Sequence, residues 1–177
     1  RAYKPITEFE HNFIYLVNGK LISKSFNHEE KDKIFINNFD YKNEIILNRE
    51  NTLNFLNNAL AKDGFSLEVS KNYKFKKPLV IYNQLSNSLK ETILNNKNSI
   101  ILNENSELTL INLVDNASKE NFMINTIEEI KLKKNSSLKS ILINNSKNNA
   151  YFYKYLKNDL EKNSSLENYI LSSGLIF

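Results

Sequence analysis

The residues that could carry acid–base or metal chemistry are few and lie far apart. There are two histidines, His11 and His28, and there is no cysteine. A zinc or other transition-metal site needs several His, Cys or carboxylate ligands that converge on one point. Because neither histidine has a second histidine close by in the sequence, we expect both to be surface or hairpin residues. We predict no metal ligand, no cofactor-binding residue and no catalytic residue in the chain.

Two pairs of adjacent glutamates, Glu29-Glu30 and Glu128-Glu129, are the remaining acid–base candidates. Neighbouring side chains point to different faces of a strand or helix, whereas glycoside hydrolysis needs two carboxyl groups that face each other across the substrate. Solvated side chains are therefore the simpler interpretation of both pairs. The serines lack the G-x-S-x-G pattern of a nucleophile elbow and have no plausible histidine base. The sequence predicts a protein without a catalytic centre.

The composition is that of a folded protein that binds neither nucleic acid nor membranes. The 177 residues are 41% hydrophobic and 25% charged, which suits one ordinary domain with a buried core. The net charge of +4 comes from lysines interleaved with acidic residues, whereas nucleic-acid-binding proteins concentrate Lys and Arg on one face. No apolar run approaches the ~18 residues of a membrane span, and the first residues form no signal peptide. We expect a soluble cytoplasmic protein.

The N-terminal region predicts a β-hairpin. Two apolar runs, Phe13–Val17 and Leu21–Ser23, flank Asn18 and Gly19. This dipeptide is favoured in tight hairpin turns because both central positions tolerate positive φ. The charged run at residues 28–35 fits a short helix.

A helical pattern begins after Asn51 and ends before Gly64. Asn51 suits the N-cap and Gly64 the C-terminal stop, so we predict a helix from about residue 52 to 62. Three leucines recur on one face at i, i+3 and i+7, and they are expected to be buried. They are Leu53, Leu56 and Leu60.

The rest of the chain predicts short strands separated by a recurring corner. An Asn-Ser pair followed by one polar residue and Leu begins at Asn105, Asn135 and Asn163, 30 and 28 residues apart, and a fainter copy begins at Asn72. Such spacing is typical of a β-solenoid, in which each turn stacks on the last, and Asn suits the corners because it tolerates left-handed backbone. Chance recurrence in an Asn-rich chain is the alternative. The predicted strands are Ser66–Ser70, Leu79–Tyr82, Ser99–Leu102, Glu107–Val114, Ile127–Leu132, Leu138–Ile143, Ala150–Leu156 and Leu166–Ser172.

The stretch "NTLNFLNNALAKDGFSLEVSKNYKFKKPLVI" resembles the entry to the β-helix in the SufB/SufD family of iron–sulfur cluster assembly proteins. The matching residues are Leu56-Asn57, Ala59-Leu60, Asp63-Gly64, Val69 and Lys77-Pro78-Leu79. "KNSIILNENSELTLINLV", "NTIEEIKLKKNSSLKSILI" and the segment from Asn148 onward are similar to later segments of the family, in the same order. The chain departs from the family where the glycine of the corner motif is replaced, by Asn103, Lys133 and Glu161.

The resemblance implies a mainly β fold: a right-handed parallel β-helix, or β-solenoid, preceded by a small α/β N-terminal cap. We divide the chain into two parts. Residues 1–64 form a cap with a hairpin and a capping helix, and residues 65–177 form the first turns of the β-helix, which we expect to be truncated at the C-terminus. The helix is read as a plug that covers the first turn of the solenoid.

The resemblance also implies a non-catalytic scaffold, and the short N-terminal region is most similar to the SufD branch of the family. Its partners would be a SufB-like paralogue and a SufC-like ATPase, bound through regions beyond these residues, and no family site residue carries over to this stretch. No cofactor is expected here, although the complete machinery assembles iron–sulfur clusters. Two alternative functions stay open: an unrelated β-solenoid adhesion or binding module and a β-helix polysaccharide enzyme. Separately, the exposed end of the solenoid could form a homodimer.

Overall fold

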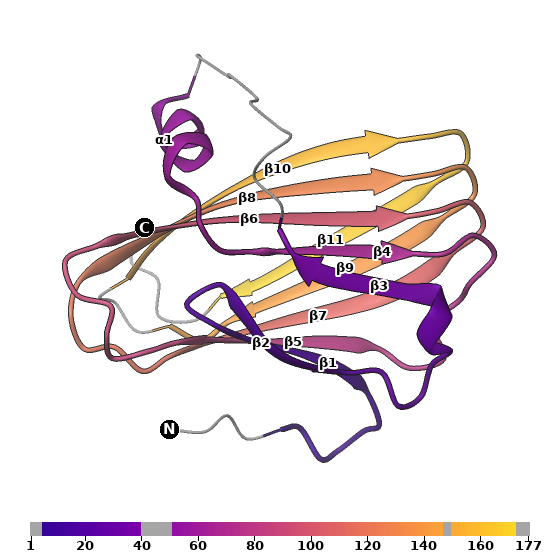
Figure 1. Ribbon diagram of the computed structural model, residues 1–177, viewed down its shortest axis with the longest axis horizontal. Coiled ribbons are helices and arrows are strands. Elements are labelled where there is room, and N and C mark those ends of the chain that lie inside the picture. The colour runs from indigo at the N-terminus through magenta and orange to yellow at the C-terminus, as the bar shows by residue number, and fades with distance from the viewer. Residues whose placement is uncertain (1–4, 40–50, 147–149, 173–177) are drawn as a thin grey trace.

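The computed structural model describes residues 5–39, 51–146 and 150–172, whose strands form two sheets that face each other (Figure 1). Sheet A has the strand order β11-β9-β7-β5-β1-β2, and sheet B has the order β10-β8-β6-β4-β3. The strands are β1 (Asn12–Val17), β2 (Lys20–Ser25), β3 (Ile34–Asn38), β4 (Phe65–Val69), β5 (Leu79–Leu85), β6 (Ile93–Leu102), β7 (Glu107–Asn116), β8 (Phe122–Leu132), β9 (Ser137–Asn144), β10 (Ala150–Leu160) and β11 (Ser165–Ser172).

From β4 onward the chain alternates between the two sheets, so each strand of sheet B and the following strand of sheet A make one turn of a solenoid. Successive turns pair in parallel: β4, β6, β8 and β10 in sheet B, and β5, β7, β9 and β11 in sheet A. The predicted mainly β solenoid is confirmed, and all eight strands predicted after Gly64 are present. Most extend beyond the predicted ends because parallel pairing continues into polar residues that carry no strand signal of their own.

Antiparallel strands extend the two sheets at the N-terminal end of the solenoid. β1 pairs in parallel with β5 and carries β2 as an antiparallel partner, while β3 pairs antiparallel with β4. The predicted hairpin is confirmed, with positive φ of 51° at Asn18 and 83° at Gly19. Strand β3 was missed: the charged run forms a 3-10 helix at Lys31–Lys33, and Ile34 and Ile36 then enter the core. The division of the chain at residue 64 stays a prediction.

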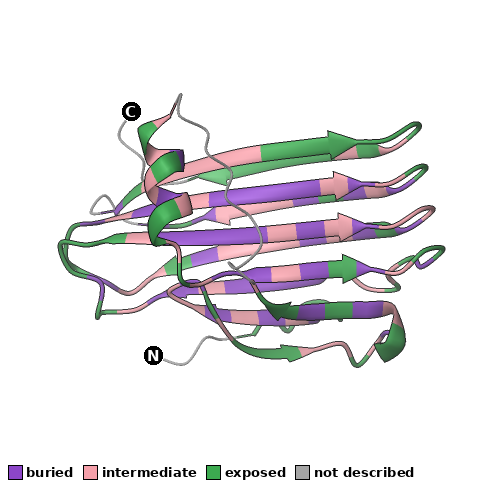
Figure 2. Cartoon of the chain, turned by 45° about the horizontal axis from the view of Figure 1, so that its top comes forward, coloured by how far each residue is buried: buried purple, intermediate pink, exposed green. Residues whose placement is uncertain are grey.

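The apolar interior falls into two clusters, one at each end of the strands. The larger cluster lies near the Asn corners and contains the inward residues of all the turns, among them Leu67, Ile100, Ile130 and Leu138. The smaller cluster lies at the opposite bends. Its members are Leu85, Leu89, Val114, Phe122, Ile124 and Ala150. Figure 2 shows this buried interior between the sheets, and it shows that the last turn, β10 and β11, is largely exposed.

The Asn corners form one ladder along the solenoid. Asn72, Asn105, Asn135 and Asn163 all have positive φ, between 55° and 61°. The side-chain amides of Asn105, Asn135 and Asn163 each donate to the Oδ1 of the corner Asn one turn earlier, over 2.7, 2.9 and 3.3 Å. The repeat is therefore structural and not a chance recurrence, and it explains how the corners turn without glycine: Asn tolerates left-handed backbone.

We expect Asn135→Ala to lower the free energy of unfolding by about 2 kcal/mol. The left-handed backbone conformation is unfavourable for alanine, and the hydrogen bonds of the ladder are lost. Asn135→Gly keeps the backbone conformation available and should cost only about 1 kcal/mol. Urea unfolding of the two variants measures both values. Equal losses would show that backbone conformation is not what Asn135 contributes.

The helix α1 (Thr52–Leu60) is capped as predicted but ends earlier. Asn51 Oδ1 accepts hydrogen bonds from the backbone N–H groups of residues 53 and 54, at 2.9 and 3.2 Å, and the C-cap is Ala61. Gly64 is not the helix stop. It lies at φ 148°, and a Cβ there would be 1.8 Å from the carbonyl oxygen of Lys97. Glycine at this position therefore allows the chain to approach β6 closely.

The interpretation of α1 as a plug over the first turn is wrong. The helix lies on the outer face of sheet B, over β6 and β8 (Figure 1). Its buried residues are Asn54 and Asn57, whereas Leu60 is 53% exposed. The Asn57 amide donates to the carbonyls of Asn96 (2.9 Å) and Asn125 (2.7 Å). Amide hydrogen bonds hold the helix on the sheet, while Leu53 and Leu56 are only half-buried.

We therefore expect Asn57→Ala to lower the free energy of unfolding by about 2 kcal/mol, because two hydrogen bonds are lost at a fully buried position. Leu60→Asp, which a plug would not tolerate, should change it by no more than about 0.5 kcal/mol. Thermal melts of the two variants provide the measurement. A large loss of stability for Leu60→Asp together with a small loss for Asn57→Ala would support the interpretation of α1 as a plug.

Candidate functional site

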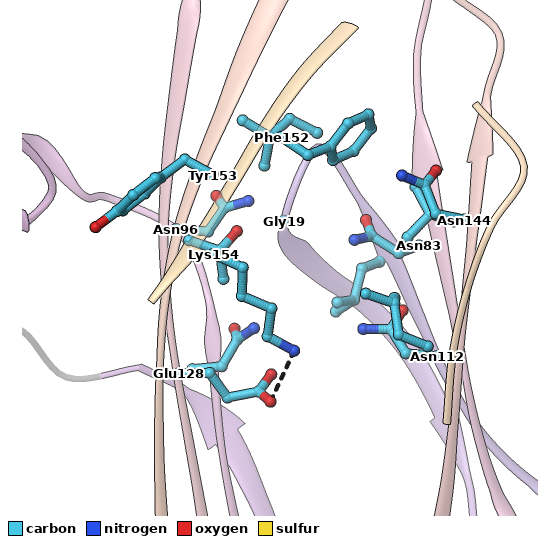
Figure 3. Close-up of a pocket in the computed structure, with 15 residues that line it drawn as sticks. Gly19, Asn83, Asn96, Asn112, Glu128, Asn144, Phe152, Tyr153 and Lys154 are labelled. Carbon is cyan, nitrogen blue, oxygen red and sulfur yellow. Dashed lines mark ion pairs between the residues drawn. The ribbon is translucent and has the colours of Figure 1, made fainter. Parts of the chain in front are cut away.

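The interior of the solenoid becomes polar between the two apolar clusters, where it encloses a cavity of about 80 Å3 (Figure 3). Both sheets contribute polar side chains to its wall. Asn83, Asn112 and Asn144 come from β5, β7 and β9 of sheet A, and Asn96, Asn98, Glu128 and Lys154 come from β6, β8 and β10 of sheet B.

Strand alternation places these side chains inside. In β7 the residues in phase with Leu108 and Leu110 are Asn112 and Val114, so Asn112 shares the inward face of the strand. Parallel register then stacks the positions from turn to turn: Asn98 lies beside Glu128, and Thr126 lies beside Lys154. The polar section therefore forms a band across several turns.

Glu128 and Lys154 form the charged part of the cavity. The Lys154 Nζ lies 2.9 Å from a Glu128 carboxylate oxygen, and the two side chains are 26% and 5% exposed, respectively. The interpretation of Glu128-Glu129 as a solvated pair is thus wrong. Burial of the Glu128 carboxylate is tolerated because a lysine on the next turn supplies the opposite charge.

Glu129 points to the opposite face of β8, as expected for adjacent residues, but it is also buried. Its carboxylate lies 3.7 Å from the Nζ of Lys97 and 3.8 Å from that of Lys157. The Lys97 ammonium lies 5.2 Å from the centre of the Phe39 ring. This ion cluster sits on the outer face of sheet B and is separate from the cavity.

Glu29 is likewise buried, so the solvated interpretation of the first pair holds only for Glu30. The Glu29 carboxylate accepts hydrogen bonds from the Asn12 amide at 2.8 Å and the Tyr73 hydroxyl at 2.6 Å. It also accepts from the backbone N–H groups of Lys76 and Lys77. Glu29 therefore ties the start of β1 to the segment that leads into β5.

The histidines do not line the cavity. His11 Nε2 lies 2.7 Å from the hydroxyl of Tyr82, and its Nδ1 lies 3.0 Å from the carbonyl oxygen of Phe9. His28 lies near Glu10, whose pKa is lowered mainly by Lys77 and to a smaller extent by His28. Within residues 5–39, 51–146 and 150–172, no three His, Cys, Asp or Glu side chains gather in a group that could hold a metal ion.

Among the cavity residues, sequence reasoning singled out Glu128, which it read as solvated, and it missed the asparagines and Lys154. The available signal was a polar residue in the inward phase of an otherwise apolar strand, as at Asn83 and Asn112. That signal becomes readable only once the register between turns is known, because isolated Asn residues are common throughout this chain.

The arrangement can bind a small hydrogen-bonding guest. The amide oxygens are acceptors, and the one cation, Lys154, already pairs with the one carboxylate among the lining residues. None of the lining residues is a cysteine or histidine, and the one hydroxyl of serine or threonine type, on Thr126, has no histidine among the lining residues to activate it. The cavity is therefore interpreted as a site of binding.

Stacked parallel strands, an Asn ladder at the corners and a partly polar interior define a parallel β-solenoid. The sequence profile of one family, described as "SUF system FeS cluster assembly, SufBD core domain", matches residues 84–175, just over half of the chain. The chain belongs to this family. The match begins at the end of β5 and runs through β6 to β11, and it does not favour an unrelated adhesion module.

Comparison with curated protein sequences gave no match. No helix among the described residues is long and apolar enough to cross a membrane.

Proposed function

We propose that this chain is part of a SufD-like scaffold subunit of the SUF machinery, a cytoplasmic, non-catalytic protein that helps to assemble iron–sulfur clusters. The observation that carries the proposal is the SufBD core match over residues 84–175. The N-terminal stretch with "FIYLVNGKLIS", which resembles the SufD branch more than the SufB branch, supports the finer assignment.

The geometry agrees with a structural role. The buried acidic residues Glu29, Glu128 and Glu129 are all engaged with Lys, Asn, Tyr or backbone groups. Each of the three carboxylates therefore has structural partners that make its burial tolerable. Iron–sulfur clusters would be the cargo of the complete assembly, and the partners would be a SufB-like paralogue and a SufC-like ATPase.

Affinity purification of the full-length protein from its native cells, followed by mass spectrometry of the complex, tests this proposal. We expect a SufB-like chain and a SufC-like chain to co-elute with it. Co-elution of SufC alone with a second copy of this protein would instead place it in the SufB branch. Elution without either partner would contradict the SUF role.

We also propose that the segment itself forms a homodimer through its last turn. In β11 the inward Ile170 stacks in register on Leu142, yet it is 64% exposed, and Tyr169 and Leu171 beside it are 49% and 58% exposed. Apolar side chains beside unpaired strand edges favour association with another strand, and a second copy supplies the same edge and the same apolar residues.

We expect residues 1–177 to elute as a dimer and the Ile170→Lys variant as a monomer, because the charge would have to be buried against the partner. Light scattering coupled to size-exclusion chromatography provides the mass. Ile22→Lys, at a position on β2 where the isoleucine is 53% exposed, is the matched control and should remain dimeric. A monomeric parent, or a dimer lost only in the control, would contradict the proposal.

A further inference from the structure

The cavity between the two sheets contains buried oxygens without a hydrogen-bond partner in the described part of the chain. Figure 3 shows the side chains of Asn83 and Asn112 on one side of the cavity and that of Asn96 on the other. The Oδ1 atoms of all three are buried and have no hydrogen-bond partner among the residues that the structure describes. Asn96 is only 4% exposed as a whole residue. Exchanging the oxygen and nitrogen of an amide would merely replace an unpaired acceptor by an unpaired donor.

Three unsatisfied amides in one place are not expected in a stable interior, because buried polar groups almost always have a partner. The backbone that carries two of these side chains is held in place by pairing on both sides: Asn83 pairs with Leu16 and Val114, and Asn112 pairs with Ile81 and Leu142. A guest inside the cavity must therefore supply the missing hydrogen bonds.

The size and polarity of the cavity select the guest. A cavity of about 80 Å3 is well below the roughly 300–1,000 Å3 of pockets for organic ligands, but each water molecule needs only about 10–15 Å3 of such space together with two to four polar partners. A metal cation is disfavoured because the Lys154 ammonium already lies 2.9 Å from Glu128. Water can donate to an amide oxygen or accept from an amide nitrogen, so it suits either orientation of the asparagines.

We propose that the polar section of the solenoid is a binding site for a small cluster of ordered water molecules. The waters bridge Asn83 and Asn112 on sheet A to Asn96 on sheet B and hydrate the Glu128–Lys154 pair. The cluster joins the two sheets at a level where the described residues make no backbone hydrogen bond from one sheet to the other. It exchanges with solvent on the β10 side, where Lys154 is 26% exposed.

A crystal structure of the full-length protein at a resolution that shows individual waters tests the site. We expect at least two density peaks in the cavity, each about 2.7–3.2 Å from an Asn83, Asn96 or Asn112 amide atom. A cavity without density, amides turned to bond one another, or elongated density from an organic molecule would each overturn the proposal.

Asn112→Leu gives a second, independent readout, with Asn37→Leu on the exposed face of β3 as the matched control. Leucine has nearly the size of asparagine but cannot bond to water. If water molecules bond to the Asn112 amide, the substitution removes these hydrogen bonds, and their loss offsets the gain from burying an apolar side chain. The melting temperature, corrected by the control variant, should then stay within about 2 °C of the parent. A rise of about 4 °C or more would show that Asn112 had been left unsatisfied in a dry cavity.

Discussion

Replacing Lys154 by methionine is expected to lower the free energy of unfolding by about 3 kcal/mol, because Glu128 would be left as an unpaired charge inside the solenoid. Glu128 is 4% exposed and cannot reach solvent past the two sheets. The polar cavity beside it keeps the cost at the lower end of the range for a broken buried pair. Urea unfolding at neutral pH measures the loss.

The reverse substitution separates this explanation from a simple packing effect. In Glu128→Leu the orphaned charge is Lys154, whose side chain is 26% exposed and whose flexible stem can carry the ammonium to solvent. We expect a loss of only about 1 kcal/mol, and the double variant should lie within about 1 kcal/mol of the parent because no charge is left behind. A double variant as unstable as Lys154→Met would show that the lysine contributes through packing and not through its charge.

The repeating part of the fold could be predicted from sequence because each turn carries its own local signal. A single Asn-Ser corner is weak evidence, but Asn105, Asn135 and Asn163 must occupy equivalent positions if the turns stack, and the ladder of amide bonds shows that they do. The hairpin at Asn18 and the N-cap at Asn51 were readable for the same reason: local backbone conformation depends on the residue at the turn.

The position of α1 and the buried charges depend on tertiary contacts, and the sequence alone did not reveal them. The leucine stripe of α1 predicted an apolar contact, yet Asn57 is the residue whose amide donates hydrogen bonds to backbone carbonyls on β6 and β8. Likewise, Glu128 is buried with its partner 26 residues later in the chain, and only parallel register brings the two together. Polar residues whose partners lie one turn away look like surface residues when the sequence is read in order.

We expect Glu29→Gln to lower the free energy of unfolding by about 3 kcal/mol. Glu29 is buried, and four groups donate hydrogen bonds to its carboxylate: the Asn12 amide, the Tyr73 hydroxyl and two backbone N–H groups. Hydrogen bonds to a charged group contribute more than neutral ones, and an amide would turn its own N–H donors toward these donors. Thermal and urea unfolding of the variant provide the value.

Glu30→Gln is the matched control. Glu30 is the neighbouring residue, and its side chain is 53% exposed and lies 3.7 Å from the Lys76 ammonium. The free energy of unfolding of Glu30→Gln should therefore stay within about 0.5 kcal/mol of the parent. Tyr73 gives a readout that global instability would not produce. Burial, and then the hydrogen bond to Glu29, raise the pKa of Tyr73 to about 12. Removing the Glu29 charge should lower this pKa, which NMR of 13C-labelled tyrosine follows; an unchanged Tyr73 pKa would mean that Glu29 does not hold β1 to the solenoid through this hydroxyl.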